Sequence, residues 1–384
     1  MKIDIFNHVM PVRYLDMMKQ HLKDPGILKR MSNLRMLWDI EARVQMLDDK
    51  FPDVQQVLTL SLPSPELVGG PELAPELARI ANDGMADMVR KWPKKFPAFV
   101  ASLPMNNVEA SLAEMDRAIG ELGARGVQIF TNMNGRPLDD PEFFPIFDRM
   151  SRKYDLPIWV HPVRTAKFVD YPGEAKSKYE IWWLFGWPYE TSAFMARLVF
   201  SGMMEKLPNL KIITHHLGAM APFFEARIGL GMDQLGTRTS DEDYTAILRR
   251  MGKRPVDYFK MFYADTSING SASAIRCGLD FYGQDHVLFG TDCPFDPEGG
   301  PMFIRENIRA ITSLKLKEGD LRKMYFGNAI KMLRLELPVE AKKKPAAAKA
   351  PKKKAAAKAP KKKAAAKAPK KKSAPRKKAK AKRK

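Results

Sequence analysis

Residues 157–161 read Pro157-Ile158-Trp159-Val160-His161, a short run of β-branched and aromatic residues that ends in a histidine. Such a run predicts a β-strand. Seven further runs of this kind occur, at residues 3–6, 54–60, 98–103, 127–131, 211–215, 262–265 and 287–290. Each is followed by a stretch of helical periodicity or by a loop, so strand and helix alternate. Eight such units in about 340 residues predict an α/β fold, the (β/α)8 TIM barrel.

An open, doubly wound sheet is the alternative to the barrel. It would carry a glycine-rich phosphate turn after an early strand, and no G-x-G-x-x-G occurs in the chain. Two long gaps between runs, residues 7–53 and 162–210, are therefore expected to be βα loops that line the mouth of the barrel. The second gap holds an aromatic cluster. Its Trp187 is a candidate for substrate binding, with core packing or lid contacts as the alternative.

The composition changes abruptly after Leu337-Pro338. Residues 341–384 hold 22 Lys or Arg and no acid, so residues 1–340 keep 43 basic against 44 acidic residues and the net charge of +21 belongs to the tail. We expect a barrel domain at residues 1–337 and a disordered Lys/Ala/Pro-rich tail at 338–384. A body without net charge lacks the electrostatic footprint of a nucleic-acid-binding domain, whereas the tail has one.

The cysteine count and the apolar segments indicate the compartment. Cys277 and Cys293 are the only cysteines, which excludes a disulfide framework and a cysteine-rich metal site. No stretch approaches 18 uninterrupted apolar residues, and the N-terminal segment lacks the apolar stretch of a signal peptide. We therefore expect a soluble cytoplasmic protein that does not associate with membranes.

Polar side chains that could carry chemistry stand where the predicted strands end. His8 follows the first run, His161 ends the fifth, His215-His216 end the sixth, and Asp292 lies two residues beyond the eighth. The open end of a parallel barrel collects the side chains at such positions. Four of the six histidines of the chain fall in this set, which argues against unrelated surface or core histidines. Imidazole and carboxylate together favour one divalent metal ion with an open coordination position, zinc first and manganese as the alternative.

Several stretches spread over residues 1–336 resemble one known family. They are Met1-Lys2-Ile3-Asp4-Ile5-Phe6-Asn7-His8, Trp38-Asp39-Ile40-Glu41-Ala42-Arg43, Gly126-Val127-Gln128-Ile129, Val160-His161-Pro162, His216-Leu217-Gly218-Ala219-Met220-Ala221-Pro222-Phe223, Gly290-Thr291-Asp292-Cys293-Pro294-Phe295 and Gly327-Asn328-Ala329. In their order they are similar to the amidohydrolase-related family that contains aminocarboxymuconate-semialdehyde decarboxylase and the resorcylate-type decarboxylases. The Gly-Thr-Asp-x-Pro-Phe stretch is the most specific of them.

The resemblance implies a role for each site residue. A mononuclear metal would be held by a His-x-His pair on the first strand, a histidine after the fifth and the aspartate after the eighth. These positions here are His8, His161 and Asp292. The resemblance also implies His216 as general acid/base acting with Asp292.

The resemblance further implies two arginines that bind the substrate carboxylate. Arg43 is the first of them, although a solvated charge paired with Asp39 along the helix would be the structural alternative. Arg227 is the second, contributed by the neighbouring subunit, which implies a homodimer. A structural ion pair is the alternative for Arg227.

Phe6 departs from the family pattern. Residues two apart on a strand point to the same side, so the pattern requires histidine at both 6 and 8, and this chain offers Phe6 and His8. Asn7 should face the opposite way. Loss of one ligand in four would remove on the order of 3 kcal/mol of metal affinity. Two interpretations remain: a catalytic site with a weaker or different metal, and a metal-poor barrel that has lost the family chemistry.

Two classes of function therefore follow. The first is an enzyme, a metal-dependent non-oxidative decarboxylase of an aromatic or unsaturated carboxylic acid, with hydrolysis or hydration on the same scaffold as the related alternative. The second is a protein that associates non-specifically with nucleic acid or another polyanion through its tail, with the barrel as its core. One concerns the body and the other the tail, so both can hold.

Overall fold

The computed structural model describes residues 1–238 and 242–336. These residues belong to one compact unit, whereas the predicted tail at 338–384 lies outside the described residues.

Each of the eight predicted runs contains or forms a strand of one parallel system. The strands are β1 (Lys2–Val9), β2 (Val54–Leu60), β3 (Ala101–Ser102), β4 (Val127–Phe130), β7 (Ile158–His161), β8 (Ile212–Thr214), β9 (Tyr263–Asp265) and β10 (Val287–Leu288). β1 pairs with β2, and β3, β4, β7, β8, β9 and β10 are neighbours in chain order. The remaining strands, β5 (Asn132–Met133) and β6 (Arg136–Pro137), form a short antiparallel hairpin after β4.

Two connections close this parallel system into a ring. Leu58 of β2 pairs in parallel with Phe99, just before β3. On the other side, the Ile5 amide of β1 donates to the Phe289 carbonyl, directly after β10, over 2.9 Å. The predicted barrel is therefore confirmed, and the open doubly wound sheet is excluded.

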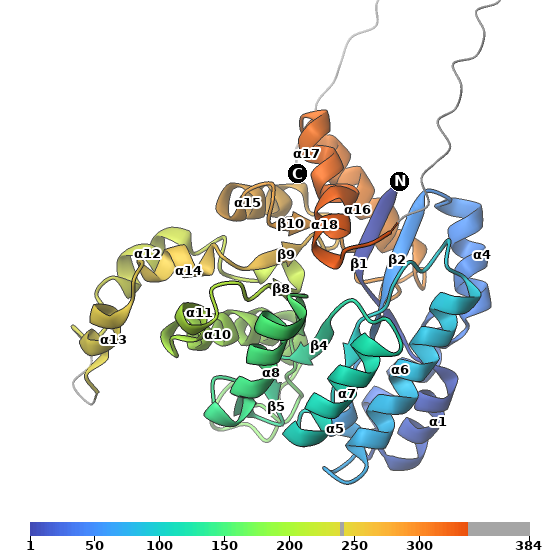
Figure 1. The fold of residues 1–384 in the computed structure, drawn as a ribbon, viewed down its shortest axis with the longest axis horizontal. Coiled ribbons are helices and arrows are strands. Elements are labelled where there is room, and N and C mark those ends of the chain that lie inside the picture. Colours follow the sequence, from blue (N-terminus) through green and yellow to red (C-terminus); the bar gives the residue numbers. More distant parts are fainter. Residues whose placement is uncertain (239–241, 337–384) are drawn as a thin grey trace, which may run out of the picture. The chain divides into compact units, whose positions relative to one another are not determined.

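Helices separate consecutive strands and lie outside the ring, as Figure 1 shows for α6, α7 and α10. Up to β7 they are α1 (Val12–His21), α2 (Pro25–Asn33), α3 (Arg35–Trp38), α4 (Ile40–Lys50), α5 (Pro65–Val68), α6 (Ala74–Lys91), α7 (Val108–Gly120) and α8 (Phe144–Arg149). After β7 they are α9 (Ile181–Leu184), α10 (Gly186–Phe200), α11 (Met203–Lys206), α12 (Glu225–Met232), α13 (Tyr244–Arg250), α14 (Pro255–Phe259), α15 (Ala272–Tyr282), α16 (Pro301–Ser313), α17 (Glu318–Arg322) and α18 (Asn328–Leu333).

The interior of the ring is filled by side chains rather than left open. Trp159 of β7 is fully buried, and its indole N–H donates to the Ile5 carbonyl of β1 over 2.9 Å. Because β7 and β1 are not neighbours in the ring, this bond crosses the lumen. Ile3, Val57 and Leu288 belong to the same buried cluster, which α18 joins. Side chains thus close one end of the lumen, and reactive groups are expected at the other end.

The two long gaps of the sequence fold over the mouth of the barrel. Residues 12–50 form α1 to α4, and residues 181–200 form α9 and α10. Asp24 and Arg30 from the first segment and Trp182 and Trp187 from the second line one cavity together with His216. The predicted βα loops therefore do line the mouth, although they contain helices.

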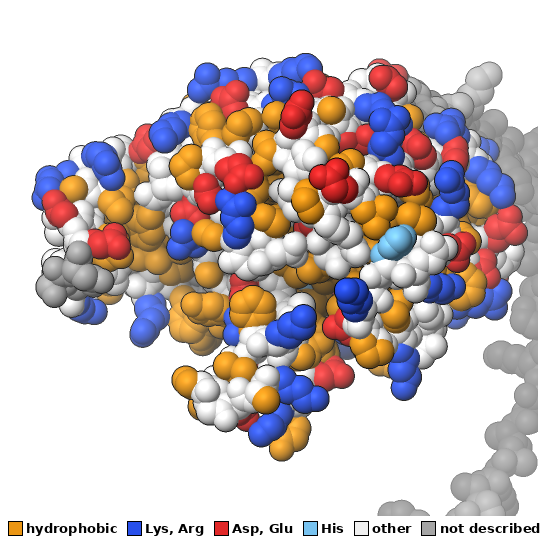
Figure 2. Space-filling model, turned by 90° about the horizontal axis from the view of Figure 1, so that it is seen from below, with side chains coloured by type: hydrophobic (Ala, Val, Ile, Leu, Met, Phe, Trp, Pro, Cys, Tyr) orange, Lys and Arg blue, Asp and Glu red, His pale blue; other side chains and the backbone are white. Residues whose placement is uncertain are grey.

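Charged side chains of both signs are interspersed over the face of the molecule drawn in Figure 2. Many charged side chains of the described residues form ion pairs, such as Arg305 with Glu298 at 2.8 Å. Within the described residues, no helix is long and apolar enough to cross a membrane.

Candidate metal and substrate site

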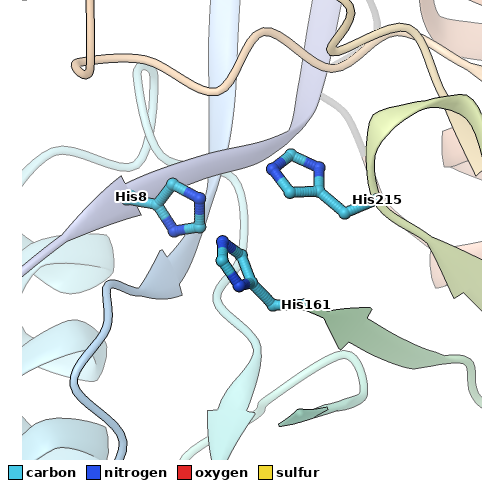
Figure 3. Close-up of side chains that lie close together, drawn as sticks. All are labelled: His8, His161 and His215. Carbon is cyan, nitrogen blue, oxygen red and sulfur yellow. The ribbon is translucent and has the colours of Figure 1, made fainter. Parts of the chain in front are cut away.

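Side chains from four strand ends meet at one point in the mouth of the barrel. His8 lies on β1, His161 ends β7 and His215 follows β8, and Figure 3 shows their rings pointing toward one another. The loop after β10 brings Asp292 Oδ1 to 3.2 Å from His8 Nε2 and 3.5 Å from His215 Nε2. Two groups of possible ligands, each with its ligand atoms within 4.8 Å of one another, are His8, His161 and His215, and His215, His216 and Asp292.

One ring nitrogen of His8 and of His161 is already engaged by the protein. His8 Nδ1 lies 3.2 Å from the Thr59 hydroxyl oxygen, whose own proton goes to the Asn7 carbonyl, so Nδ1 is the protonated nitrogen. His161 Nδ1 lies 2.7 Å from the Pro162 carbonyl, which can only accept. Each Nε2 is therefore left with a lone pair for the site, the usual arrangement of metal-binding histidines.

This tautomer leaves two acceptors facing each other, His8 Nε2 and Asp292 Oδ1. His8 Nε2 is buried and has no hydrogen-bond partner among the described residues. A buried polar atom without a partner is costly, and a cation between the imidazole and the carboxylate would satisfy both. The residues present therefore fit a divalent metal ion, which would be held by His8, His161 and Asp292 among others.

The charges of the cluster also suit a cation. Burial alone would raise the pKa of Asp292, but the hydrogen bond from His215 and the positive charge of that imidazole hold it well below its usual value. Burial lowers the pKa of His8, and burial together with the neighbouring His215 lowers that of His161 much further. An ionised carboxylate and two neutral imidazoles are the protonation states that metal coordination requires.

His215 differs from the other imidazoles in its charge. Burial alone would lower its pKa, but the carboxylates of Asp265 and Asp292 raise it to about 9. The Nδ1 of His215 makes a short hydrogen bond to Asp265 Oδ2. When no cation is bound, the two carboxylates therefore favour the protonated form of this imidazole.

His216 faces the cavity beside this cluster. Its Nε2 lies 3.7 Å from Asp292 Oδ2, and burial with the neighbouring His215 lowers its pKa. Trp187 stacks over His216 with ring centroids 6.4 Å apart and 17° between the planes, and its indole N–H donates to the Arg164 carbonyl over 3.2 Å. The structure therefore brings the predicted catalytic pair, His216 and Asp292, and the predicted substrate-binding Trp187 to one wall.

The cavity in front of His216 and Asp292 has a volume of about 770 Å³, and tryptophan and phenylalanine side chains form part of its wall. Arg30 of α2 is enclosed in it between two rings: its guanidinium carbon lies 5.5 Å from the Trp183 ring centroid and 5.2 Å from that of Phe295. No carboxylate pairs with Arg30 within residues 1–238 and 242–336. A half-buried cation without a counter-ion is suited to an anionic ligand.

Arg43 does not lie where the resemblance placed it. It is fully buried on α4 and lines no part of the cavity. Its guanidinium donates to Gln56 Oε1, the carbonyls of His8 and Met36, and Asn7 Oδ1, at 2.9 to 3.2 Å. The expected carboxylate-binding role is therefore corrected to a structural one, because its hydrogen-bond donors hold β1 and β2 rather than a ligand. The proposed ion pair with Asp39 is also absent, since Asp39 pairs with Arg35.

Arg227 lies on α12, is exposed, and does not line the cavity of its own chain. No ion pair of its side chain occurs within the part of the chain that the structure describes. A role in the site of this same chain is therefore excluded, and a role toward a second subunit stays a prediction.

The structure places two residues at the site to which the sequence had assigned no role. His215 was noted as part of a histidine doublet at a strand end, but without a function. Arg30 carried no sequence signal, because α2 belongs to a segment whose folding over the barrel mouth could not be read from a strand pattern.

A closed parallel barrel with histidines and an aspartate at the carboxyl ends of its strands defines the class of metal-dependent hydrolase-type barrels. The chain belongs to the amidohydrolase family, whose model matches residues 3–335.

Named relatives agree with this assignment. The chain is 32% identical over 304 residues to 2-amino-3-carboxymuconate-6-semialdehyde decarboxylase of Dictyostelium discoideum, covering 78% of this chain and 77% of the relative. It is 30% identical over 318 residues to a gamma-resorcylate decarboxylase of Polaromonas sp., covering 78% and 89%. A solved dihydroxybenzoic acid decarboxylase from Polaromonas sp., with bound manganese and the inhibitor 2-nitroresorcinol, is 26% identical with a TM-score of 0.66, covering 87% of this chain and 96% of that one.

Proposed function

We propose that this protein is a metal-dependent, non-oxidative decarboxylase of an aromatic or unsaturated carboxylic acid. The observation that carries the proposal is the composition of one cavity. It joins a cluster that fits a divalent cation, the acid/base pair His216 and Asp292, aromatic walls and the unpaired cation Arg30. The names of the relatives, all decarboxylases of such acids, support the same reaction.

The chain's own residues account for the steps of the reaction. Arg30 holds the substrate carboxylate by charge-assisted hydrogen bonds, and Trp187 and Trp183 pack against the ring. His216, beside the Asp292 carboxylate, takes up a proton from water and delivers it to the ring carbon that bears the carboxylate. The carbon–carbon bond then breaks, its electron pair returns to the ring and carbon dioxide leaves. When bound, the cation supplies polarisation and orientation of a neighbouring substrate oxygen.

The identity of the cation needs a direct comparison. Imidazole ligands favour zinc, whereas carboxylate and water favour manganese. The solved relative from Polaromonas sp. carries manganese. We propose one divalent ion per chain and expect zinc and manganese both to bind.

The test is an assay of the purified full chain, loaded separately with zinc or manganese, against a panel of hydroxybenzoates. Carbon dioxide release with an equimolar decarboxylated product is the expected result. Products of hydrolysis or hydration would instead favour the related chemistry on this scaffold. No turnover with either metal on any substrate would contradict the enzymatic proposal.

Arg227 leads to a second, quaternary proposal. Close to Arg227 in the chain, the residues Phe223 and Leu230 are 80% and 67% exposed. Large apolar side chains around an exposed arginine are typical of a subunit contact. We propose a homodimer in which Arg227 reaches the partner's cavity, and light scattering of wild type and Leu230→Glu would test it, since the variant should be monomeric.

A further inference from the structure

We propose that His215 supplies the imidazole ligand that is missing at position 6, so that His8, His161, His215 and Asp292 hold the metal. The presence of a cation rests on the proposed function, whereas the inference concerns which side chains bind it. Among the described residues, His215 is the one that both groups of possible ligands share.

Phe6 occupies the position where a histidine ligand is missing. Its ring is fully buried, lies 5.7 Å from the His8 ring, and so faces the same lumen as His8. The Phe6 ring also stacks on His215, with centroids 3.8 Å apart and 19° between the planes. The phenyl ring offers no ligand atom, but it supports one face of an imidazole that reaches the cluster from β8. The imidazole ligand that the family pattern has at position 6 on β1 thus comes here from His215, directly after β8.

The orientation of His215 is that of a metal ligand. Its Nδ1 bonds to Asp265, which is fully buried at the end of β9 and also accepts from the Ser267 amide over 2.8 Å. This carboxylate fixes the ring and leaves Nε2 directed at Asp292 Oδ1, 3.5 Å away. Carboxylate–histidine–metal arrangements of this kind orient the ligand and raise its basicity.

Gly290 makes this packing sterically feasible. A Cβ atom there would lie 2.8 Å from Asp265 Cβ, 2.9 Å from Ser267 Oγ and 3.2 Å from Phe6 Cβ. The absence of a side chain at Gly290 therefore lets Phe6 of β1 and Asp265, which holds His215, both pack closely against the backbone before Asp292.

A metal-free alternative uses the same contacts. A protonated His215 would bridge Asp265 and Asp292 and take the place of the cation. The two arrangements differ in one measurable property. If His215 is a ligand, removing its ring weakens metal binding. If it is only a bridge, the protein binds no metal at this site with or without it.

The experiment measures binding of Mn²⁺ and Zn²⁺ to the metal-stripped full chain by calorimetry, with metal content by mass spectrometry and folding by circular dichroism. We expect one ion per wild-type chain. His215→Phe should bind roughly a hundredfold more weakly, about the share of one ligand in a four-ligand site. Exposed His21→Gln, which removes an imidazole elsewhere, should bind as the wild type does.

The reciprocal double variant Phe6→His/His215→Phe is the sharper test. It exchanges two stacked rings and returns an imidazole to β1, so metal affinity should recover to within about tenfold of wild type. Asp265→Asn keeps the ring but removes the negative charge that raises its basicity, and should bind about tenfold more weakly. This variant decides the question if His215→Phe does not fold.

The results separate the inference from the proposed function, because no substrate is involved. Wild-type affinity in folded His215→Phe and in Asp265→Asn would overturn the inference, and so would a wild type that binds no metal. A metal site that depends on His215, in a protein without decarboxylase activity, would uphold the inference and reject only the proposed reaction.

Discussion

Arg30 and Arg43 are two buried or half-buried arginines with opposite surroundings. Arg30 has two aromatic rings and no carboxylate, whereas Arg43 makes four hydrogen bonds to the protein. Arg30→Ala should therefore raise KM for the carboxylate substrate on the order of tenfold to a hundredfold, since a hydrogen bond to a charged group contributes about 1.5–3 kcal/mol. Steady-state kinetics would check this, with exposed Arg13→Ala on α1 as the control.

Arg43→Met should act on stability instead. Its loss leaves buried acceptors on Gln56, Asn7 and the His8 carbonyl without donors, so the free energy of unfolding should fall by about 3 kcal/mol or more. A KM effect confined to Arg43, with unchanged stability, would restore the role that the sequence suggested.

Glu66 gives the molecule a pH-dependent stability. Burial raises the pKa of its carboxyl from 4.5 to about 7. Between these values the folded protein keeps a proton that the unfolded chain has released, so the free energy of unfolding falls as pH rises from about 4.5 to 7. The total for this one group is about 3 kcal/mol at most. Burial raises the pKa of Asp4 to about 7 as well, with the same sign.

The free energy of unfolding of Glu66→Gln should therefore fall less than that of the wild type over this pH range. The difference between variant and wild type should grow in favour of the variant as pH rises. Urea unfolding at several pH values in the presence of a chelator measures the difference, in which other titrating groups cancel. Exposed Glu41→Gln is the matched control. Parallel pH curves for wild type and Glu66→Gln would show that this carboxyl is not protonated in the folded protein.

At the scale of the element, helix α2 positions the substrate-binding arginine. The Asp24 carboxylate caps the helix, accepting from the Gly26 and Ile27 amides over 2.9 and 3.1 Å. Asp24→Ala should cost about 1 kcal/mol of stability and raise KM several-fold, because Arg30 lies on the same short helix. Asp24→Asn keeps the cap without the charge and should stay close to wild type in unfolding and kinetics. Equal effects of both variants would assign the change to the lost charge.

The strands could be predicted from the sequence, whereas the way in which the helices between β1 and β2 pack on the barrel could not, and the reason is physical. A strand such as the one in residues 157–161 can be recognised from its own residues, because a buried strand is rich in apolar and β-branched side chains. The direction of Arg30 or Arg43 depends instead on how the segment between β1 and β2 folds onto the barrel. The pairing of Phe6 with His215 is likewise a contact between distant strands. Sequence therefore located the strand ends, while the division of roles among their side chains required three-dimensional contacts.

At the scale of the whole molecule, charge separates the barrel from the tail. Residues 1–340 are close to neutral, and interspersed charges cover the face seen in Figure 2. Residues 341–384 carry 22 positive charges. Any sequence-independent affinity for DNA should therefore reside in the tail, which contains no aromatic residue for base stacking.

A chain that ends at Val339 should keep metal binding and turnover and lose DNA binding in a gel-shift assay. If about ten cations of the full chain displace counter-ions, the slope of log affinity against log salt should be near −9. A chain of full length with glutamine in place of the tail lysines separates charge from length and should behave like the truncated one. DNA binding by the truncated chain would place the DNA-binding site on the barrel. A higher KM of the truncated chain would show that the tail contributes to substrate binding, since a polycation near a cavity raises the local concentration of an anionic substrate.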